Sequence, residues 1–454
     1  MGLCCLLMHG QIVPCRGSRV RIVDKLSVKS RFTFLPFLRW LPEYQRPGVV
    51  RTDLLAGLTG AIVVLPQGIA FALLAGMPPH YGLYAAMVPC IIAALFGSSR
   101  LMVTGPANAI SLTTMALIAP LAIPESQHYV ALVLTLSFLI GAIQIALGLG
   151  GAGKWVEKVP HSVIVGFTAG AAVLIINSQV GTLLGIDIER GTKVIDTISK
   201  TFTSIQHGQW RPEVLLLVLI TLVAMRLWKP LNKWVPAMLV AVIMGSVALL
   251  VFEKYFPVFD QIRRVSAIPG ALPPLSFPQL TLDHLQLLFG PVLVITLLAS
   301  TEAMAIARAM AIKRNDTFDA NQEFIGQGFA NVAGSFFSAY PSSGSFNRSG
   351  VNLAANAQTP LSAIAAALFL VIFLAFVSPL AEYLPYAVVA ALLLAVAWNL
   401  IDVQQIRHEI RSGPREWIPM LITGLGTFLI SLEWAILAGI CVAAIAKRWP
   451  QSAK

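Results

Sequence analysis

Apolar runs long enough to cross or half-cross a lipid bilayer recur along the chain from residue 54 to residue 446. Inside a bilayer every backbone N–H and C=O must be paired within the protein, so runs of this length are expected to be helices. Of the 454 residues, 57% are hydrophobic and only 12% are charged, and the mean hydropathy is +0.77. The sequence therefore predicts an all-α polytopic membrane protein.

The apolar runs form two sets of seven, separated by the longest polar connection, residues 253–284. An odd number of spans inverts the second set relative to the first, which predicts fourteen transmembrane segments as 7+7 inverted repeats. The first set is 54–76, 82–97, 107–120, 129–149, 160–184, 212–227 and 236–252. The second set is 285–312, 322–339, 345–356, 360–378, 384–400, 417–431 and 433–446.

The distribution of positive charge predicts the orientation. With a cytoplasmic N-terminus, the inside loops and termini carry 24 of the 32 Lys and Arg residues, the outside loops carry 7, and Arg348 is left inside segment 10. This asymmetry predicts that both termini are cytoplasmic, and we expect a multi-pass protein of a bacterial inner (plasma) membrane. The net charge of +11 follows mostly from this topology. Because the basic residues are dispersed among short loops, no nucleic-acid partner is expected.

Two Gly/Pro/Ser-containing breaks, Val103–Ser111 and Tyr340–Gly350, occupy corresponding places in the two sets. Each break opens a helix, segments 3 and 10, at bilayer depth. The first N–H groups of such a half-helix are unpaired and its positive dipole end is exposed, which attracts an anion. If both half-helices begin near the midplane, their N-termini converge on one pocket. Paired breaks of this kind indicate the binding site of a transporter.

Arg348 is the only Lys or Arg placed well inside a span. A cation at bilayer depth is costly and usually functional. The hydroxyl and amide groups around it, from Ser342, Ser343, Ser345 and Asn347, suit the oxygens of an oxyanion. The alternative is that segment 10 is misplaced and Arg348 lies in an aqueous loop.

Glu302 is the only acidic residue well inside an apolar span. Desolvation favours its neutral form, whereas a nearby Arg348 would favour the carboxylate. A carboxyl balanced in this way can take up a proton or help to hold a cation, and so couple an ion to the anion. The structural alternative, compatible with the first, is a buried ion pair between Glu302 and Arg348.

Gln67 and Phe71 lie four residues apart on one face of segment 1. Pro66 and Gly68 loosen that helix where a ligand could approach. Gln67 would then contact a ligand; the alternative is that Gln67 forms a hydrogen bond to another helix. The five cysteines and seven histidines show no metal-binding pattern, and no nucleophile–base pair or phosphate loop is present. We therefore expect no enzyme activity, metal or cofactor.

Together these residues resemble the SulP family of anion transporters, which includes the sulfate permeases. The resemblance is carried by the long motif Asp53–Tyr84, and continues at Gly105–Pro106, Asn321–Asn331 and Gly344–Ser349. It covers about residues 35–448. There are departures: Phe71 stands where Tyr is common, and the sequence after segment 10 reads Asn-Ala-Gln-Thr-Pro where many members have a basic third residue.

The resemblance implies a core domain, residues 54–149 and 285–378, that moves against a gate domain, residues 160–252 and 384–446, by alternating access. The anion would be held between segments 1, 3, 8 and 10. Glu302 matches an acidic position that many bacterial members use for proton or sodium coupling. Carried over by position, the substrate-site residues are Gln67, Phe71, Ala107, Asn108, Ser345, Phe346, Asn347 and Arg348.

The expected domain organisation is a cytoplasmic N-terminal segment with an interfacial lead-in (1–53), a transporter domain (54–448) and a cytoplasmic tail (449–454). SulP members typically carry a cytoplasmic STAS domain after the last span, and this sequence shows none up to Lys454, either because it is truncated or because this member lacks the domain. The resemblance also implies a homodimer.

The expected function is secondary active transport of a small inorganic oxyanion, sulfate first, coupled to H⁺. The alternatives are a Na⁺-coupled bicarbonate or C4-dicarboxylate transporter, a passive anion channel, and a membrane scaffold that transports nothing. Glu302 argues against a passive channel, because such a pore needs no intramembrane carboxylate. The paired helix breaks argue against a scaffold.

Overall fold

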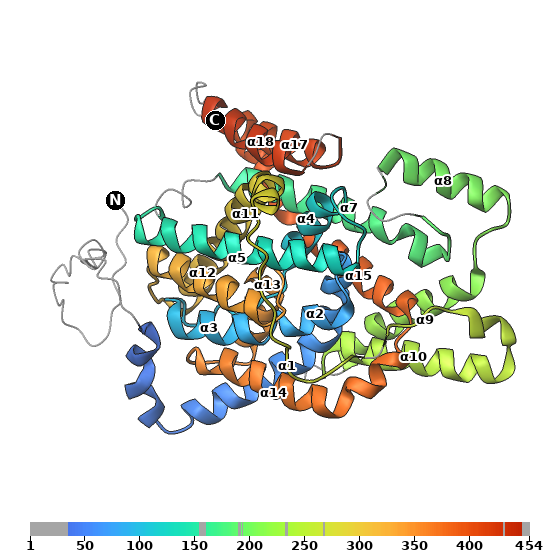
Figure 1. Ribbon diagram of the computed structural model, residues 1–454, viewed down its shortest axis with the longest axis horizontal. Helices are drawn as coiled ribbons and strands as arrows, with labels where there is room; N and C mark the ends of the chain where they lie inside the picture. The colour runs from blue at the N-terminus through green and yellow to red at the C-terminus, as the bar shows by residue number, and fades with distance from the viewer. Residues whose placement is uncertain are drawn as a thin grey trace, which may run out of the picture. The chain divides into compact units, whose positions relative to one another are not determined.

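The computed structural model describes residues 35–153, 160–188, 192, 194–231, 235–266, 268–429 and 432–446. Most of the expected N-terminal segment and the whole of the tail 449–454 lie outside these residues. The described chain is predominantly helical (Figure 1).

Every segment expected from the sequence contains at least one helix. The first set corresponds to α1 (Val49–Leu74), α2 (Pro79–Tyr84), α3 (Val88–Phe96), α4 (Asn108–Ile118), α5 (Gln127–Leu149), α7 (His161–Leu184), α9 (Pro212–Leu231) and α10 (Ala237–Tyr255). The second set corresponds to α11 (Leu282–Arg314), α12 (Ala320–Phe336), α13 (Phe346–Ala354), α14 (Leu361–Val377), α15 (Tyr386–Leu400), α17 (Pro414–Leu429) and α18 (Leu432–Ala446).

Several short helices were not expected from the sequence. They are the α-helices α8 (Val194–Gln206) and α16 (Val403–Ser412) and the 3₁₀-helices η1 (Pro36–Gln45), η2 (Pro257–Gln261) and η3 (Ser378–Tyr383). In η1, the ring of Trp40 lies 4.3 Å from the guanidinium carbon of Arg100, which also pairs with Glu43 at 2.9 Å. The lead-in is thereby attached to the α3–α4 connection.

Among the described residues, seven helical stretches are long and apolar enough to cross a membrane. The longest is α11, with 33 residues. An all-α polytopic membrane protein is therefore confirmed. The count of fourteen spans stays a prediction, because α4 and α13 contain only 11 and 9 residues, about half of what a full crossing requires.

A two-stranded antiparallel pair joins the two helix breaks. Strand β1 (Thr104–Gly105) pairs with β2 (Ser343–Gly344), with Thr104 opposite Gly344. Beyond β2, the N–H of Ser345 donates to the main-chain oxygen of Val103 across 3.0 Å. The strand β1 leads towards α4, and β2 leads into α13. Because the two strands are antiparallel, the two short helices start side by side and run in opposite directions.

The helices pack in two groups. One group contains α1, α3, α4, α5 and α11–α14, and the other contains α7, α9, α10, α15, α17 and α18. Pairings recur between the two halves of the chain, since α1 packs on α14 as α11 packs on α5, and α9 packs on α10 as α17 packs on α18. The main contacts between the groups are those of α1 with α15 and α10, and of α4 with α7.

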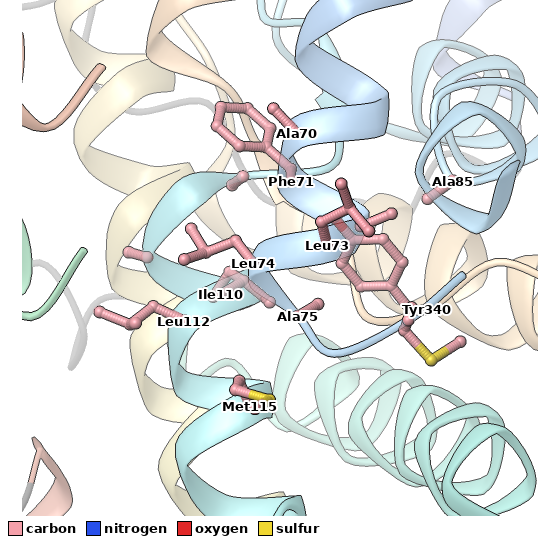
Figure 2. Close-up of a cluster of buried hydrophobic side chains, with 14 of the residues drawn as sticks. Ala70, Phe71, Leu73, Leu74, Ala75, Ala85, Ile110, Leu112, Met115 and Tyr340 are labelled. Carbon is pink, nitrogen blue, oxygen red and sulfur yellow. The ribbon is translucent and has the colours of Figure 1, made fainter. Parts of the chain in front are cut away.

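The first half-helix is fixed by apolar packing. Figure 2 shows Leu74 of α1 beside Ile110 and Leu112 of α4, and all three side chains are buried. The hydroxyl groups of Tyr340 and Ser111 lie 2.8 Å apart. This contact links α4 to the segment that precedes β2.

Candidate functional site

The helix α4 starts without a side-chain cap. Gly105 and Pro106 precede it, and Ala107 at its N-cap is extended (φ −123°, ψ 144°). Because the first-turn N–H groups of an α-helix have no intrahelical acceptor, those of α4 remain available to a ligand. At α13, the hydroxyl of Ser345 accepts from the N–H of Arg348 at 3.5 Å, which is a weak cap.

A cavity of about 100 Å³ lies at the two helix starts. It is bordered by Asn108 at the start of α4, by residues 345–347 at the start of α13, by Phe71 of α1 and by part of α11. The helix α7, from the other packing group, closes it with a mainly apolar surface that includes Phe167. A cavity of this size has room for several water molecules, and therefore for one small oxyanion.

The structure brings together five of the eight substrate-site residues expected from the sequence. These five cavity-lining residues are Phe71, Asn108, Ser345, Phe346 and Asn347. Ala107 is buried and caps α4 but is not among the lining residues. Gln67 and Arg348 do not line the cavity either.

Gln67 faces another helix. Its Nε2 donates to the sulfur of Met238 in α10 across 3.4 Å, and its Oε1 is buried without a hydrogen-bond partner. A thioether is a weak acceptor, so this contact contributes little. The geometry matches the interhelical alternative for Gln67 more closely than a direct substrate contact.

Arg348 points into the strand pair. Its side chain is buried; Nη1 donates to the main-chain oxygen of Thr104 across 2.7 Å, and Nη2 to the sulfur of Cys90 across 3.5 Å. Its Nε has no partner. No ion pair joins Arg348 to Glu302, although the structure describes both residues. Arg348 therefore supports the backbone beneath the cavity, and the ion-pair alternative is not realised.

Glu302 borders the cavity, and its Oε2 is buried without a hydrogen-bond partner. The hydroxyl of the neighbouring Thr301 is used locally, since it donates to the main-chain oxygen of Leu297 across 2.6 Å. A buried carboxyl oxygen without a partner is costly unless it binds a proton, a cation or a water molecule. Glu302 is therefore placed to exchange an ion with the contents of the cavity.

Sequence reasoning did not identify the side chains of α12 that hold the two strands. Gln327 donates through Nε2 to the hydroxyl of Thr104 across 2.7 Å. Asn331 accepts from the N–H of Ser342 across 2.8 Å and donates to Gln144 of α5 across 2.9 Å. Both amides lie in the stretch 321–331 that carries the family resemblance, but nothing in their spacing indicates that one contacts β1 and the other the residue before β2.

The model of the sulfate permease family matches residues 50–423. Sulfate transporter 4.1, chloroplastic, from Arabidopsis thaliana is 33% identical over 428 residues, covering 93% of this chain and 61% of that protein. The putative sulfate transporter YvdB of Bacillus subtilis is 31% identical over 396 residues, covering 86% of this chain and 72% of that protein. The chain thus spans less than two thirds of the length of the Arabidopsis protein.

Similar structures have been solved, among them the following two. The transmembrane domain of the cyanobacterial bicarbonate transporter BicA has a TM-score of 0.75 and 26% identity, and the alignment covers 89% of this chain and 98% of that one. The overall structure of SLC26A9 has a TM-score of 0.82 and 22% identity, with 91% of this chain and 68% of that one covered. At this identity the second similarity concerns the fold alone.

Proposed function

Since this chain belongs to the sulfate permease family, we propose that it carries a small inorganic oxyanion across the membrane by secondary active transport. Sulfate is the first candidate substrate, because the relatives named above are a sulfate transporter and a putative sulfate transporter. As a secondary transporter, the chain would act without enzymatic chemistry, by binding the anion and exposing it to each side in turn.

The observation that carries this proposal is the cavity at the two helix starts. Asn108 and Asn347 supply amide groups there and Ser345 supplies a hydroxyl, all of which can donate to oxyanion oxygens. Each helix N-terminus adds about 0.3–1 kcal/mol for an anion, and up to about 2 kcal/mol where it is partly buried. Two such ends at one cavity favour an anion over a neutral or cationic ligand.

The packing supports alternating access. The cavity is bordered by α4, α11 and α13 from one helix group and by α7 from the other. A displacement of one group against the other would open or close the cavity without disrupting the packing within either group. We assign the moving core to residues 54–149 and 285–378 and the gate to residues 160–252 and 384–446.

Glu302 is the proposed coupling residue, with H⁺ as the coupling ion. Its position at the cavity and its unpartnered Oε2 support this role. Na⁺-coupled bicarbonate transport is the second candidate, and its bicarbonate substrate is supported by the similarity to the bicarbonate transporter BicA, whose transmembrane domain matches over 98% of its length. We further propose that both termini face the cytoplasm of a bacterial cell and that the protein assembles as a homodimer.

Uptake by proteoliposomes tests the proposal. Labelled sulfate, bicarbonate and a C4-dicarboxylate would each be offered with an imposed pH gradient, with a Na⁺ gradient, and with neither. Accumulation of sulfate above equilibrium under the pH gradient is the expected result. Equilibration without accumulation under any gradient would indicate a passive channel, and no uptake of any anion would contradict transport.

A further inference from the structure

The helix α8 (Val194–Gln206), between α7 and α9, carries an apolar stripe that no described part of the protein covers. The stripe consists of Ile195, Ile198, Phe202 and Ile205, whose exposed fractions are 74%, 64%, 63% and 46%. Spacings of three and four residues place them on one face of the helix. Exposed apolar side chains in such a contiguous row indicate a surface that is covered by something else.

The opposite side of α8 is polar and is partly packed against the protein. Asp196 and Lys200 are exposed there. Thr197 is buried, and its hydroxyl donates to the main-chain oxygen of Thr192 at 3.5 Å. The helix packs on α7. Its orientation is therefore set by protein contacts on the side away from the apolar stripe.

The start of α8 lies beside α7, before the level at which α7 ends. After α7 the chain reverses at Gly185, which is left-handed (φ 67°), and the N–H of Ile186 donates back to Gly181 across 2.8 Å. Asn177 of α7 then donates through Nδ2 to the main-chain oxygen of Thr192 across 3.0 Å. Asn177 precedes the last residue of α7, Leu184, by seven positions, which is about 10 Å along a helix. The first turn of α8 thus begins about 10 Å short of the level where α7 ends.

The chain that leaves α8 returns to the level of the same helix end. The N–H of Arg211 donates to the main-chain oxygen of Leu184 across 2.9 Å, so α9 starts beside the end of α7. Only five residues, 207–211, connect α8 to α9. At about 3.3–3.6 Å per residue they span no more than about 18 Å. The start of α8 is therefore held within about 10 Å of the level at which α7, a membrane-spanning helix, ends, and its exit lies within about 18 Å of the start of α9.

We propose that α8 is an interfacial membrane helix whose apolar stripe contacts the lipid bilayer. The stripe inserts at the boundary between headgroups and acyl chains, about 5–10 Å deep, and Lys200 on the opposite face remains in water. The hydrogen bonds of Thr192 and Arg211 to α7 favour the bilayer as the occupant, because they keep the stripe near the level at which α7 ends, whatever else binds. This surface is independent of transport and attaches the α7–α9 part of the protein to one leaflet.

Paired spin labels test the proposal. Phe202→Cys on the stripe and Lys200→Cys opposite it would be made singly in the full chain after replacement of its five native cysteines. Each variant is labelled with a nitroxide and reconstituted into phosphatidylethanolamine–phosphatidylglycerol vesicles. Collision with oxygen, which concentrates in lipid, is compared with collision with a water-soluble nickel chelate. We expect oxygen to dominate at Phe202 and the nickel chelate at Lys200. A second pair, Ile195→Cys and Asp196→Cys, guards against failure of either variant to fold.

Two outcomes would overturn the proposal. Dominance of the nickel chelate at all four positions would place the stripe in water. Dipolar broadening at Phe202 that disappears on dilution with unlabelled protein would show that a second copy of the chain covers it. Retained solubility and an unchanged elution volume in detergent establish that each variant is folded.

Discussion

Arg348 of α13 donates through Nη1 to the main-chain oxygen of Thr104, 2.7 Å away in the strand before α4. The two residues are 244 positions apart and belong to the two different helix breaks. One buried guanidinium from the second half of the chain therefore fixes the backbone that opens the first half-helix. Arg348 acts on the cavity through this backbone, because it does not line the cavity itself.

The first prediction concerns this contact. Arg348→Ala leaves the buried oxygen of Thr104 without its charged donor, which costs about 1–3 kcal/mol. The thermal unfolding midpoint in detergent should fall, and sulfate uptake should be lost. Arg348→Lys should restore only part of both, since an ammonium keeps the charge but lacks the guanidinium fork. Unchanged uptake and unchanged stability in Arg348→Ala would remove this residue from the support of the site.

The second prediction concerns Gly105, which lies against the same guanidinium. A Cβ at Gly105 would collide with Nη1 of Arg348, and this buried nitrogen is held in place by its hydrogen bond to the main-chain oxygen of Thr104. Gly105→Ala should therefore destabilise the protein by about 1–3 kcal/mol and weaken anion binding. Gly350→Ala is the matched control, because nothing lies within 4 Å of a Cβ there and alanine favours the helix by about 0.5–1 kcal/mol. Equal thermal midpoints for the two variants would refute the packing argument.

The sequence was sufficient for the helices of the apolar spans but not for the short polar helices or for the contacts among the spans. Apolar length and the Gly/Pro/Ser breaks predict segments that each contain a helix, including the short α4 and α13. This works because a segment inside a bilayer must pair its own backbone N–H and C=O groups, which depends on local sequence. The helices α8 and α16 escaped notice because their polar faces keep their mean hydropathy low. The pairing of β1 with β2 was also missed, since it joins only two residues from each half of the chain.

The candidate site was predictable to a similar extent. Asn108 is expected from the family resemblance, and Asn347 from that resemblance and from its place beside Arg348 in segment 10. The direction of the Arg348 side chain depends on the packing of Thr104 and Cys90 around it, which no spacing reveals. The contribution of α7 was equally hidden. Phe167 is an ordinary apolar residue in the sequence, and only the tertiary contact of α4 with α7 brings it to the cavity.

The third prediction concerns topology. If both termini are cytoplasmic, the α8–α9 connection is outside and α16 is inside. Gln209→Cys and Gln404→Cys lie at exposed positions of these two segments. In intact cells a membrane-impermeant maleimide should label Gln209→Cys and reach Gln404→Cys only after permeabilisation. The reverse pattern would invert the orientation, and labelling of both sites in intact cells would mean that the number of spans between them is even.

The last prediction concerns coupling and rests on Glu302. Its carboxyl borders the cavity, and the buried Oε2 has no partner. A proton taken up on one side and released on the other would let a pH gradient drive the anion. Glu302→Gln keeps nearly the same shape but cannot ionise, so it should retain sulfate binding and sulfate–sulfate exchange while losing accumulation driven by a pH gradient. Thr296→Val is the control, because Thr296 is buried on the same helix but does not line the cavity, and it should keep both activities.

The two assays distinguish the roles open to Glu302. Accumulation by Glu302→Gln under a pH gradient would show that the carboxyl does not couple the proton. Loss of binding, exchange and accumulation together would indicate instead that Glu302 is needed to form the cavity. Repeating the wild-type assay in sodium-free buffer separates the coupling ions. A proton-coupled protein keeps its accumulation there, whereas a sodium-coupled one loses it, and the same carboxylate would then contact Na⁺ in place of a proton.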